Sequence, residues 1–268
     1  MPEQKILYLR IAEMNPKHID FYTSEILKAG AGKEIKAVVL DVRFNGGGDD
    51  RVWKKILAKL VMGKLLIKND SAAIDSPENR EYIKRHSQIV SKHFPKSEQD
   101  SSDPDKVPFY EQAGRQIPFL GNQYFLIDKD ELEITPDEDS LNLSCPVYVL
   151  IQDIYSSTGG LLAVANRSNQ LISVGMRSPV SLGKGITPLQ IALPNSKLIF
   201  SVEPAVDISD CKTAADTFHG NVEVPVEINP EEFFDYWNSS SEDYSDWLLH
   251  EDPFMKKALE LMNSEQAD

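Results

Sequence analysis

Several features are scarce in this chain of 268 residues, and each scarcity argues against a class of protein. The only cysteines are Cys145 and Cys211, which form no short-range pair such as CxxC, so neither a disulfide framework nor a zinc knuckle is expected. The five histidines show no metal-binding spacing such as HExxH, and we expect no metal. No window approaches the roughly 20 apolar residues of a transmembrane segment, and the N-terminus carries no apolar signal stretch.

Basic side chains are also scarce, because 28 Lys and Arg face 42 Asp and Glu, for a net charge of −14. The negative electrostatic field of such a protein repels phosphate backbones and anionic lipid, so we expect no nucleic-acid partner. Apolar residues make up 41% of the chain, which is typical of a globular protein. We expect one core domain over residues 1–268, with an insertion at about 70–144 and a C-terminal tail at about 231–268.

Strand and helix patterns alternate along the chain, which predicts an α/β fold. The N-terminal part predicts a strand at 6–11, a helix that ends at Gly30 and a strand at 37–42. Residues 37–42 and 146–151 are continuous apolar runs, as in parallel strands that are buried on both faces. The remaining predicted elements are helices at about 53–61, from 161 and at the C-terminus, and strands at 171–175, 189–193 and 198–202.

The insertion and the tail differ in composition from these elements. Residues 70–107 turn polar and predict a surface excursion that limited proteolysis cuts first, with a helix at 77–94 and a Ser/Asp/Pro/Lys stretch at 96–106. Residues 119–134 predict a pair of strands or a long loop. Residues 231–252 mix acidic and aromatic side chains without Lys or Arg, so we expect part of them to pack on the core; a protein-interaction arm is the alternative.

Two glycine-rich turns each follow a buried strand, at residues 45–48 and at residues 156–160. Both lie at the carboxyl ends of strands, where α/β sheets build their sites. Backbone N–H groups of such turns can form an oxyanion hole, whereas the simpler alternative is a tight strand-to-helix turn. Asp49 and Asp50 suit the N-terminus of the next helix, where carboxylates cap free N–H groups.

A lysine between two glycines, Gly183-Lys184-Gly185, is the second chemical signal. A serine hydroxyl needs a base to become a nucleophile, and a lysine serves when burial lowers its pKa. The spacing before Lys184 does not fit the GxxxxGK[ST] phosphate loop, which is rejected. A Ser-His pairing with His18 or His219 stays open, because triads assemble from residues distant in sequence.

Asp41 and Arg43 flank the start of the first glycine-rich turn. Opposite charges at this spacing predict an ion pair that steadies the turn.

Five stretches in a fixed order carry a family resemblance: YLRI at 8–11, VVLDVRFNGGG at 38–48, PVYVLIQDIYSSTGGLLAVA at 146–165, SVGMRSPVSLGKG at 173–185 and LPNSKLIFSVEPAVD at 193–207. Together they resemble the catalytic core of the C-terminal processing (tail-specific) serine proteases. The resemblance covers about residues 5–68 and 145–230. It implies a crotonase-like fold, which is a spiral of ββα units with a mixed sheet.

The resemblance also implies the catalytic residues. An ungapped register places the nucleophile at Ser157 and the base at Lys184, whereas a shifted register selects Ser156. The implied oxyanion donors are the backbone N–H groups of Gly47 or Gly48 and of Thr158.

The chain departs from the family pattern at two positions near these residues. The glutamate that the family carries three residues after the serine falls on Gly160, and the usual glutamine four residues after the lysine falls on Pro188. Gln190 could replace that glutamine only if the strand shifts. These departures put turnover in question, because the lysine amine loses partners that orient it.

The function expected from this resemblance is a serine endopeptidase that cleaves unfolded or C-terminal peptide segments through a Ser-Lys dyad and an acyl-enzyme, without a cofactor. The alternatives are an inactive peptide-binding or assembly protein of the same fold and a crotonase-like acyl-CoA enzyme, which would need a basic pocket. The expected partner is a peptide or unfolded protein, and a homo-oligomer stays open. A strand pattern begins by residue 6, so we expect a catalytic core cut from a longer protein. Family members commonly work in the cell envelope, whereas a complete chain without an export signal would be cytoplasmic.

Overall fold

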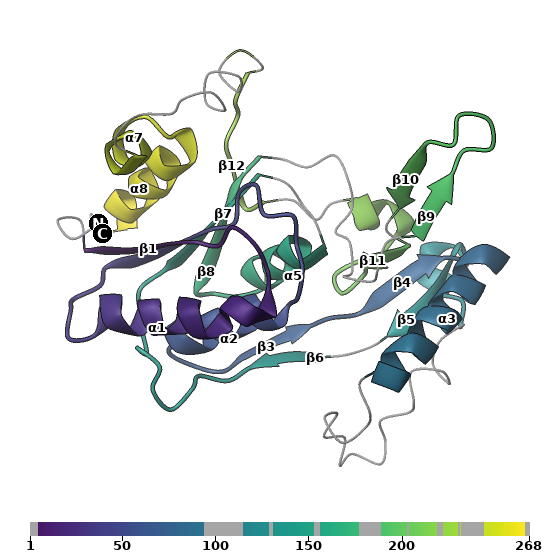
Figure 1. Ribbon diagram of the computed structural model, residues 1–268, viewed down its shortest axis with the longest axis horizontal. Coiled ribbons are helices and arrows are strands. Elements are labelled where there is room, and N and C mark those ends of the chain that lie inside the picture. Colours follow the sequence, from purple (N-terminus) through teal and green to yellow (C-terminus); the bar gives the residue numbers. More distant parts are fainter. Residues whose placement is uncertain are drawn as a thin grey trace. The chain divides into compact units, whose positions relative to one another are not determined.

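A parallel sheet forms the centre of the fold, and its strands come from widely separated parts of the chain. The computed structural model describes residues 5–93, 115–128, 131–152, 156–176, 189–202, 204–218, 222–229, 231 and 244–265. The sheet has five strands in the order β1-β2-β7-β8-β12, and each neighbouring pair is parallel (Figure 1). Its strands are β1 (Ile6–Arg10), β2 (Ala37–Asp41), β7 (Val147–Ile151), β8 (Leu171–Gly175) and β12 (Val224–Pro225). The predicted parallel strands are confirmed, but among the described residues the antiparallel pairs lie in separate sheets, so the described part of this sheet is parallel and not mixed.

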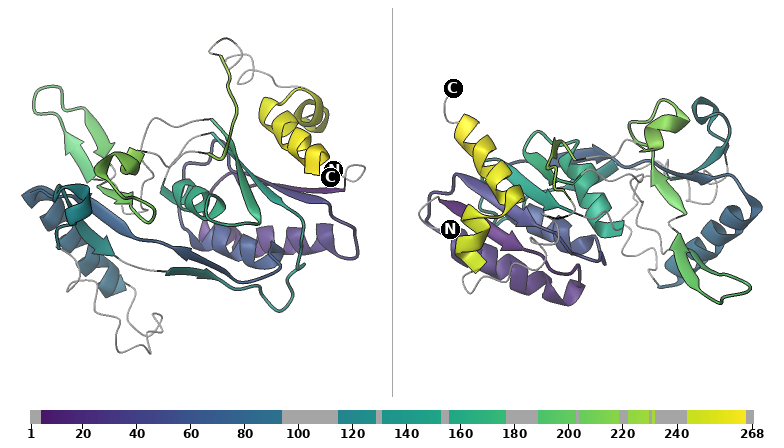
Figure 2. Two further views of the ribbon diagram at one scale, coloured as in Figure 1. Left: turned by 180° about the vertical axis from the view of Figure 1, so that it is seen from behind. Right: turned by 90° about the horizontal axis from the view of Figure 1, so that it is seen from above.

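Helices cover both faces of this sheet, which explains the continuous apolar runs of β2 and β7 (Figure 2). One face carries α1 (Ile19–Gly30), α2 (Arg51–Leu60) and α5 (Ser156–Ala165). The other face carries α8 (Pro253–Glu265), with α7 (Tyr244–His250) before it in the chain. The short 3-10 helix η1 (Pro16–His18) precedes α1, with Asn15 as its N-cap.

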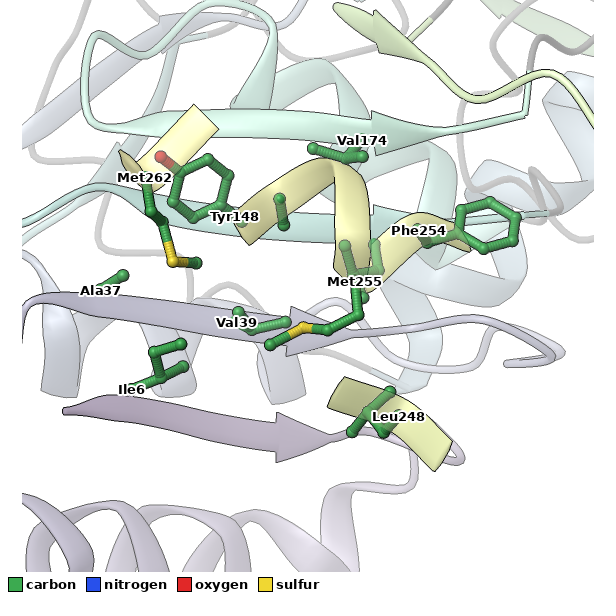
Figure 3. Close-up of a cluster of buried hydrophobic side chains, with 11 residues drawn as sticks. Ile6, Ala37, Val39, Tyr148, Val174, Leu248, Phe254, Met255 and Met262 are labelled. Carbon is green, nitrogen blue, oxygen red and sulfur yellow. The ribbon is translucent and has the colours of Figure 1, made fainter. Parts of the chain in front are cut away.

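The tail helices complete one hydrophobic layer of the protein (Figure 3). Leu248 of α7 and one side of α8 pack against alternate residues of the sheet; the buried members are Ile6, Ala37, Val39, Tyr148, Leu150, Val174, Leu248, Phe254, Met255, Ala258 and Met262. The prediction that part of the acidic, aromatic tail packs on the core is therefore confirmed, although residues 232–243 lie outside the described part of the chain.

A second set of strands forms a three-stranded antiparallel sheet in the order β11-β4-β5. The strands are β4 (Ser71–Ile74), β5 (Tyr124–Asp128) and β11 (Ala205–Asp207), and α3 (Pro77–His93) packs on one face through Ile83. The helix predicted at 77–94 is confirmed. The expectation of a polar surface excursion from residue 70 is wrong for β4, which lies between two strands with Ala72 and Ala73 fully buried.

The remaining described elements are two pairs of strands and two short 3-10 helices. β9 (Leu189–Ala192) pairs with β10 (Ile199–Val202), and β3 (Leu65–Lys68) pairs with β6 (Glu131–Ile134). The 3-10 helices are η2 (Pro118–Leu120) and η3 (Ala214–Phe218). Residues 119–134 thus do hold two strands, but each pairs with a strand from elsewhere in the chain.

Contacts divide the chain into two compact units that differ from the expected core and insertion. The first unit contains residues 1–65, 133–179 and 221–268, and the second contains residues 66–132 and 180–220. Residues 66–132 therefore belong to the same unit as residues 180–220, which the sequence assigned to the core. The single-domain assignment stays a prediction. Among the described residues, no helix is both long enough and apolar enough to span a membrane.

Candidate active site

The first glycine-rich turn, residues 45–48, is held by the buried side chain of Asn45 and is called the glycine loop below. Asn45 Nδ2 donates to the carbonyl of Ile11 at 2.7 Å, and Asn45 Oδ1 accepts from the N–H of Gly47 at 2.8 Å. The N–H of Met14 donates to the carbonyl of Gly47 at 3.2 Å. These bonds join the loop to the segment that follows β1.

Gly48 has a backbone that requires glycine. Its φ is +137°, and a Cβ at this position would collide with the carbonyl oxygen of Met14. The N–H of the next residue, Asp49, donates to that same carbonyl at 2.8 Å. In contrast, a Cβ on Gly46 would meet no atom within 4 Å. The glycine loop is therefore more than a run of small residues, because one of its glycines permits a close backbone approach.

The glycine loop contains two of the oxyanion donors that the family resemblance implies, Gly47 and Gly48. The Gly47 N–H already donates to Asn45, so an oxyanion bound by Gly47 would have to share this N–H with Asn45. The role of Gly47, Gly48 and Thr158 as oxyanion donors stays a proposal.

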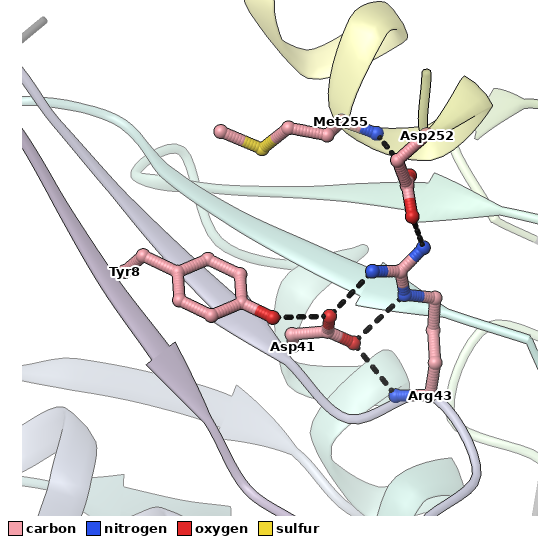
Figure 4. Close-up of polar contacts among 5 residues, drawn as sticks. All are labelled: Tyr8, Asp41, Arg43, Asp252 and Met255. Carbon is pink, nitrogen blue, oxygen red and sulfur yellow. Dashed lines mark hydrogen bonds and ion pairs between the residues drawn. The ribbon is translucent and has the colours of Figure 1, made fainter. Parts of the chain in front are cut away.

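A buried charged network supports the glycine loop from the end of β2 (Figure 4). Arg43 contacts the carboxylate of Asp41 through Nε at 2.8 Å and through Nη2 at 2.5 Å, which confirms the predicted ion pair. Tyr8 Oη donates to Asp41 Oδ2 at 2.7 Å. On its other side, Arg43 Nη1 donates to Asp252 Oδ2 at 2.6 Å, and Asp252 Oδ1 accepts from the N–H of Met255 at 2.8 Å.

Asp252 is a partner that the sequence did not reveal. Asp252 followed by Pro253 is a pattern typical of a helix start, but Arg43 lies 209 positions away in the chain. Burial raises the pKa of Asp252, and the nearby charge of Asp41 acts in the same direction, while Arg43 lowers the pKa. One guanidinium is therefore shared between two buried carboxylates.

The second glycine-rich turn, residues 156–160, is the first turn of α5 and is called the serine turn below. The prediction of a loop turn here is wrong, because α5 begins at Ser156 instead of at Leu161. Thr158 is fully buried, and the side chains of Ser156 and Ser157 lie outside the described atoms. At a helix start, the first backbone N–H groups have no partner within the helix, and the positive end of the helix dipole lies at this point.

The glycine loop and the serine turn lie at the same edge of the sheet. β2 and β7 are hydrogen-bonded parallel neighbours, with Val38 opposite Val147 and Asp41 opposite Leu150. The glycine loop follows β2 and the serine turn follows β7, so both leave the sheet at adjacent carboxyl ends. The distances agree with this placement, because a Cβ added to Gly160 would lie 3.5 Å from both carboxylate oxygens of Asp50.

The two aspartates after the glycine loop have different roles, although the sequence predicted the same capping role for both. Asp49 Oδ1 accepts from the N–H of Arg51 at 2.9 Å, and the side-chain hydrogen bond from Arg51 lowers the pKa of Asp49. Asp50 occupies the N-cap position of α2 but makes no capping hydrogen bond with its side chain. Asp50 Oδ1 accepts instead from Nε1 of Trp53 at 3.1 Å. Capping is confirmed for Asp49 and wrong for Asp50.

Other candidate residues are not brought together by the described structure. Lys184 and His219 lie outside the described residues. Gln190 is an exposed residue of β9, opposite Ser201 of β10. His18 lies 3.0 Å from Glu13 and is half exposed. In the described ranges, no group of three or more His, Cys, Asp or Glu side chains could hold a metal ion.

Comparisons with known proteins add to this geometry. The model of peptidase family S41 matches residues 5–214. A candidate peptidase from Parabacteroides merdae ATCC 43184 has a similar structure, with a TM-score of 0.54 and 16% identity over 98% of this chain and 62% of that chain. Mature CPAF complexed with lactacystin has a TM-score of 0.54 and 16% identity over 97% of this chain and 52% of that chain. The chain thus spans just over half the length of these structures, and at this identity they establish the fold alone. No curated protein matches the chain.

Proposed function

Because the chain belongs to peptidase family S41, which its match over residues 5–214 shows, we propose that it is a serine endopeptidase that cleaves unfolded or C-terminal peptide segments. The single observation that carries this proposal is the shared edge of the sheet. The glycine loop and the serine turn follow neighbouring parallel strands, and a Cβ added to Gly160 would lie 3.5 Å from the Asp50 carboxylate oxygens.

The proposed reaction uses Ser157 as the nucleophile and Lys184 as the base. The Ser157 hydroxyl attacks the scissile carbonyl carbon while the neutral Lys184 amine takes the hydroxyl proton. The negative oxygen of the tetrahedral intermediate is stabilised by backbone N–H groups, for which we propose those of Gly47 or Gly48 and of Thr158. The intermediate collapses as the C–N bond breaks, and Lys184 returns its proton to the leaving amine. Water, activated by the same lysine, then hydrolyses the acyl-enzyme and releases the acid product and free Ser157.

We propose that the substrate binds in an extended conformation. An extended peptide can add a strand to the edge of a sheet, so that main-chain hydrogen bonds supply affinity with little demand on sequence. Such binding suits an unfolded segment, whose backbone groups are available.

One specific observation favours a second function, an inactive peptide-binding protein of the same fold. Position 160 is glycine and position 188 is proline, where the resemblance places a glutamate and a glutamine. A peptide groove would survive these changes, whereas the orientation of the base would suffer. An acyl-CoA enzyme is less favoured, because nucleotide phosphates need a basic pocket and the chain carries a net charge of −14.

Serine substitutions test the proposed function. Ser157→Ala removes the nucleophile, so cleavage of an unfolded protein substrate should fall by a factor on the order of a thousand or more. Ser156→Ala is the matched control, and it should keep most of the activity. Cleavage is followed on gels, with circular dichroism to confirm that both variants fold. Wild-type rates in the Ser157→Ala variant would contradict the assignment, and loss of activity only in Ser156→Ala would shift the register by one residue.

Lysine substitutions test the base separately. Lys184→Arg keeps the positive charge but cannot lose its proton near neutral pH, so it should be as inactive as Lys184→Ala. The rate of wild-type cleavage should rise between about pH 5 and about pH 10, because the Lys184 amine loses its proton as pH rises. Equal rates in wild type and Lys184→Arg would remove lysine from the mechanism and point to the histidine alternative.

A further inference from the structure

Phe44, which immediately precedes the glycine loop, occupies a backbone position that disfavours a bulky side chain. The Val42 carbonyl accepts a hydrogen bond from the N–H of Asn45 at 3.1 Å, which closes a four-residue turn with Phe44 in the third position. The φ of Phe44 is +60°, and Arg43 does not share this positive φ. This is the pattern of a type II turn, whose third position favours Gly or Asn because a Cβ crowds the backbone there.

Phe44 differs from the other described non-glycine residues with positive φ, which are Lys5, Asn122, Asn142 and Lys197. Asparagine adopts this conformation more readily than most residues, and the two lysines are exposed. Phe44 is the apolar, aromatic member of this group. A bulky residue in this conformation is an outlier that persists only where its surroundings hold it, and such outliers cluster at functional sites.

The two neighbours of Phe44 hold its backbone in place. Arg43 is 2% exposed and binds two buried carboxylates (Figure 4), and Asn45 is 1% exposed and makes two hydrogen bonds to the backbone. Both anchors act through the side chains at positions 43 and 45, so they would hold the turn equally well with glycine at position 44. The anchors therefore explain the backbone of Phe44 but not its ring.

Phe44 also leaves apolar surface in contact with water. It is 37% exposed, although the residues on either side of it are buried. A phenylalanine side chain has no polar atom, so this exposed part gains nothing from solvent. The chain thus keeps a strained backbone and exposed aromatic surface at the same position.

Phe44 lies close to the groups that the proposed function assigns to the oxyanion. It is three residues from Gly47 and four from Gly48, so its Cα lies at most about 11 Å and about 14 Å from theirs. An extended peptide advances about 3.3 Å per residue. A substrate with its scissile carbonyl at the glycine loop therefore has other residues within reach of Phe44.

From these observations we infer that Phe44 is a specificity-determining residue: its ring is an apolar contact for the bound peptide and selects a large apolar side chain within about four residues of the scissile bond. This inference rests on the proposed function, which places the scissile carbonyl at the glycine loop. The contact removes apolar surface of both partners from water. Because the anchored turn already holds the backbone of Phe44, little ordering of the loop is needed on binding.

Peptide binding tests this contact without cleavage. The probes are two short fluorescent peptides that differ only at alternate positions, which hold Leu in the apolar peptide and Ser in the polar peptide. Both are titrated with the full chain carrying Ser157→Ala, so that they stay intact. Adding Phe44→Gly should raise the Kd of the apolar peptide about 5- to 100-fold and that of the polar peptide less than about 3-fold. Phe21→Ala, at an exposed position of α1, is the matched control and should change neither Kd.

Cleavage sites in an unfolded protein test the selection of the side chain. Mass spectrometry of the wild-type products should show large apolar residues enriched within about four positions of the cut bond. Phe44→Gly should lose this enrichment. Phe44→Tyr keeps an aromatic ring and should keep both the enrichment and the affinity for the apolar peptide.

Thermal unfolding separates a binding role from a packing role. Glycine adopts positive φ without strain, so the Tm of Phe44→Gly should stay within about 2 °C of the wild-type value or exceed it. Phe44→Ala loses the ring but keeps the strain, so it should be less stable than Phe44→Gly. A larger fall of Tm in Phe44→Gly would show that the ring packs in the fold, which overturns the inference.

The remaining outcomes distinguish this inference from the proposed function. Equal effects of Phe44→Gly on the two peptides, or no effect on either, overturn the inference. Unchanged cleavage sites in Phe44→Gly overturn it while the endopeptidase stands. Binding of the apolar peptide that depends on Phe44, without any cleavage by the wild type, supports the peptide contact and overturns the endopeptidase.

Discussion

Asp252 connects the C-terminal helix with the turn before the glycine loop. Its carboxylate caps α8 through the N–H of Met255 and also pairs with Arg43, which in turn holds Asp41. Removing one partner of such a buried pair leaves an uncompensated charge, which typically costs about 3–5 kcal/mol. Asp252→Ala should therefore destabilise the protein by about this amount, whereas Asp252→Asn keeps an acceptor and should cost less.

The pKa of Asp252 gives a pH-dependent prediction. Burial raises this pKa above the ordinary value of 3.8, so the folded protein keeps the proton to a higher pH than the unfolded chain does. The preference of the folded protein for the proton on Asp252 stabilises it at low pH. This contribution to the free energy of unfolding is lost as pH rises from about 3.8 through the raised pKa. The stability difference between wild type and Asp252→Asn should shrink over this range, as measured by urea denaturation at several pH values.

Asp49 provides a control of opposite sign. Its pKa is lowered by the hydrogen bond from Arg51, so its contribution to stability is present above the ordinary pKa and is lost as pH falls. The difference between wild type and Asp49→Asn should therefore grow as pH rises. A difference for Asp252→Asn that also grows with pH would contradict the raised pKa of Asp252.

Gly48 and Gly46 offer a second comparison of single residues. Gly48→Ala forces a side chain into a left-handed backbone and against the carbonyl of Met14, so it should destabilise the protein by about 1–3 kcal/mol. Gly46→Ala meets no atom within 4 Å and should be close to neutral. Thermal unfolding of both variants checks this, and equal effects would mean that the close approach of Gly48 to Met14 is unimportant.

Among the elements, α8 shows that the chain beyond the matched family region belongs to the core. The family match ends at residue 214, yet Phe254, Met255 and Ala258 are fully buried against the sheet. α8 closes one face of β2, β7 and β8 and carries Asp252 at its N-terminus. The tail is therefore a structural part of the first unit.

Phe254→Ala tests this role of α8. The side chain is fully buried and also lies 5.0 Å from the guanidinium carbon of Arg43, so its truncation should cost about 3–5 kcal/mol of stability. Lys256→Ala, on the exposed side of the same helix, should change stability by about 0.5 kcal/mol or less. Chemical denaturation measures both, and a small effect of Phe254→Ala would show that α8 does not cover the sheet.

At the scale of the whole molecule, the acidic charge is the dominant long-range feature. With a net charge of −14, the negative side chains of the folded protein repel one another and destabilise the compact state. The exposed ion pairs oppose this repulsion, but each adds little to stability. Salt screens both the repulsion and the ion pairs, but screening the repulsion has the larger effect because the repulsion is summed over many charges. The melting temperature should therefore rise between about 10 mM and about 200 mM NaCl at constant pH. A fall would mean that ion pairs, and not net charge, dominate the electrostatic stability.

The apolar pattern alone predicted β1, β2, β7 and β8 and the helices beside them, but it did not predict the two-residue strand β12. The runs of β2 and β7 are stable only when both faces are covered, and the spacing of Ile19, Tyr22 and Ile26 gave α1 its buried side. The same pattern placed the glycine loop and the serine turn at the carboxyl ends of strands. Short elements were harder to predict: β4 has four residues, and its two small buried alanines carry little apolar signal.

By itself, the sequence determined the α/β class, four of the five central strands and the motifs of the family, because these depend on local periodicity and residue order. Only the tertiary structure decided which distant residues meet. Arg43 and Asp252 pair across 209 positions, and the glycine loop and the serine turn lie at one edge of the sheet because β2 and β7 are neighbours. The grouping of residues 66–132 with 180–220 was decided in the same way. Such contacts depend on the order of strands in a sheet, and no pattern within a single segment records that order.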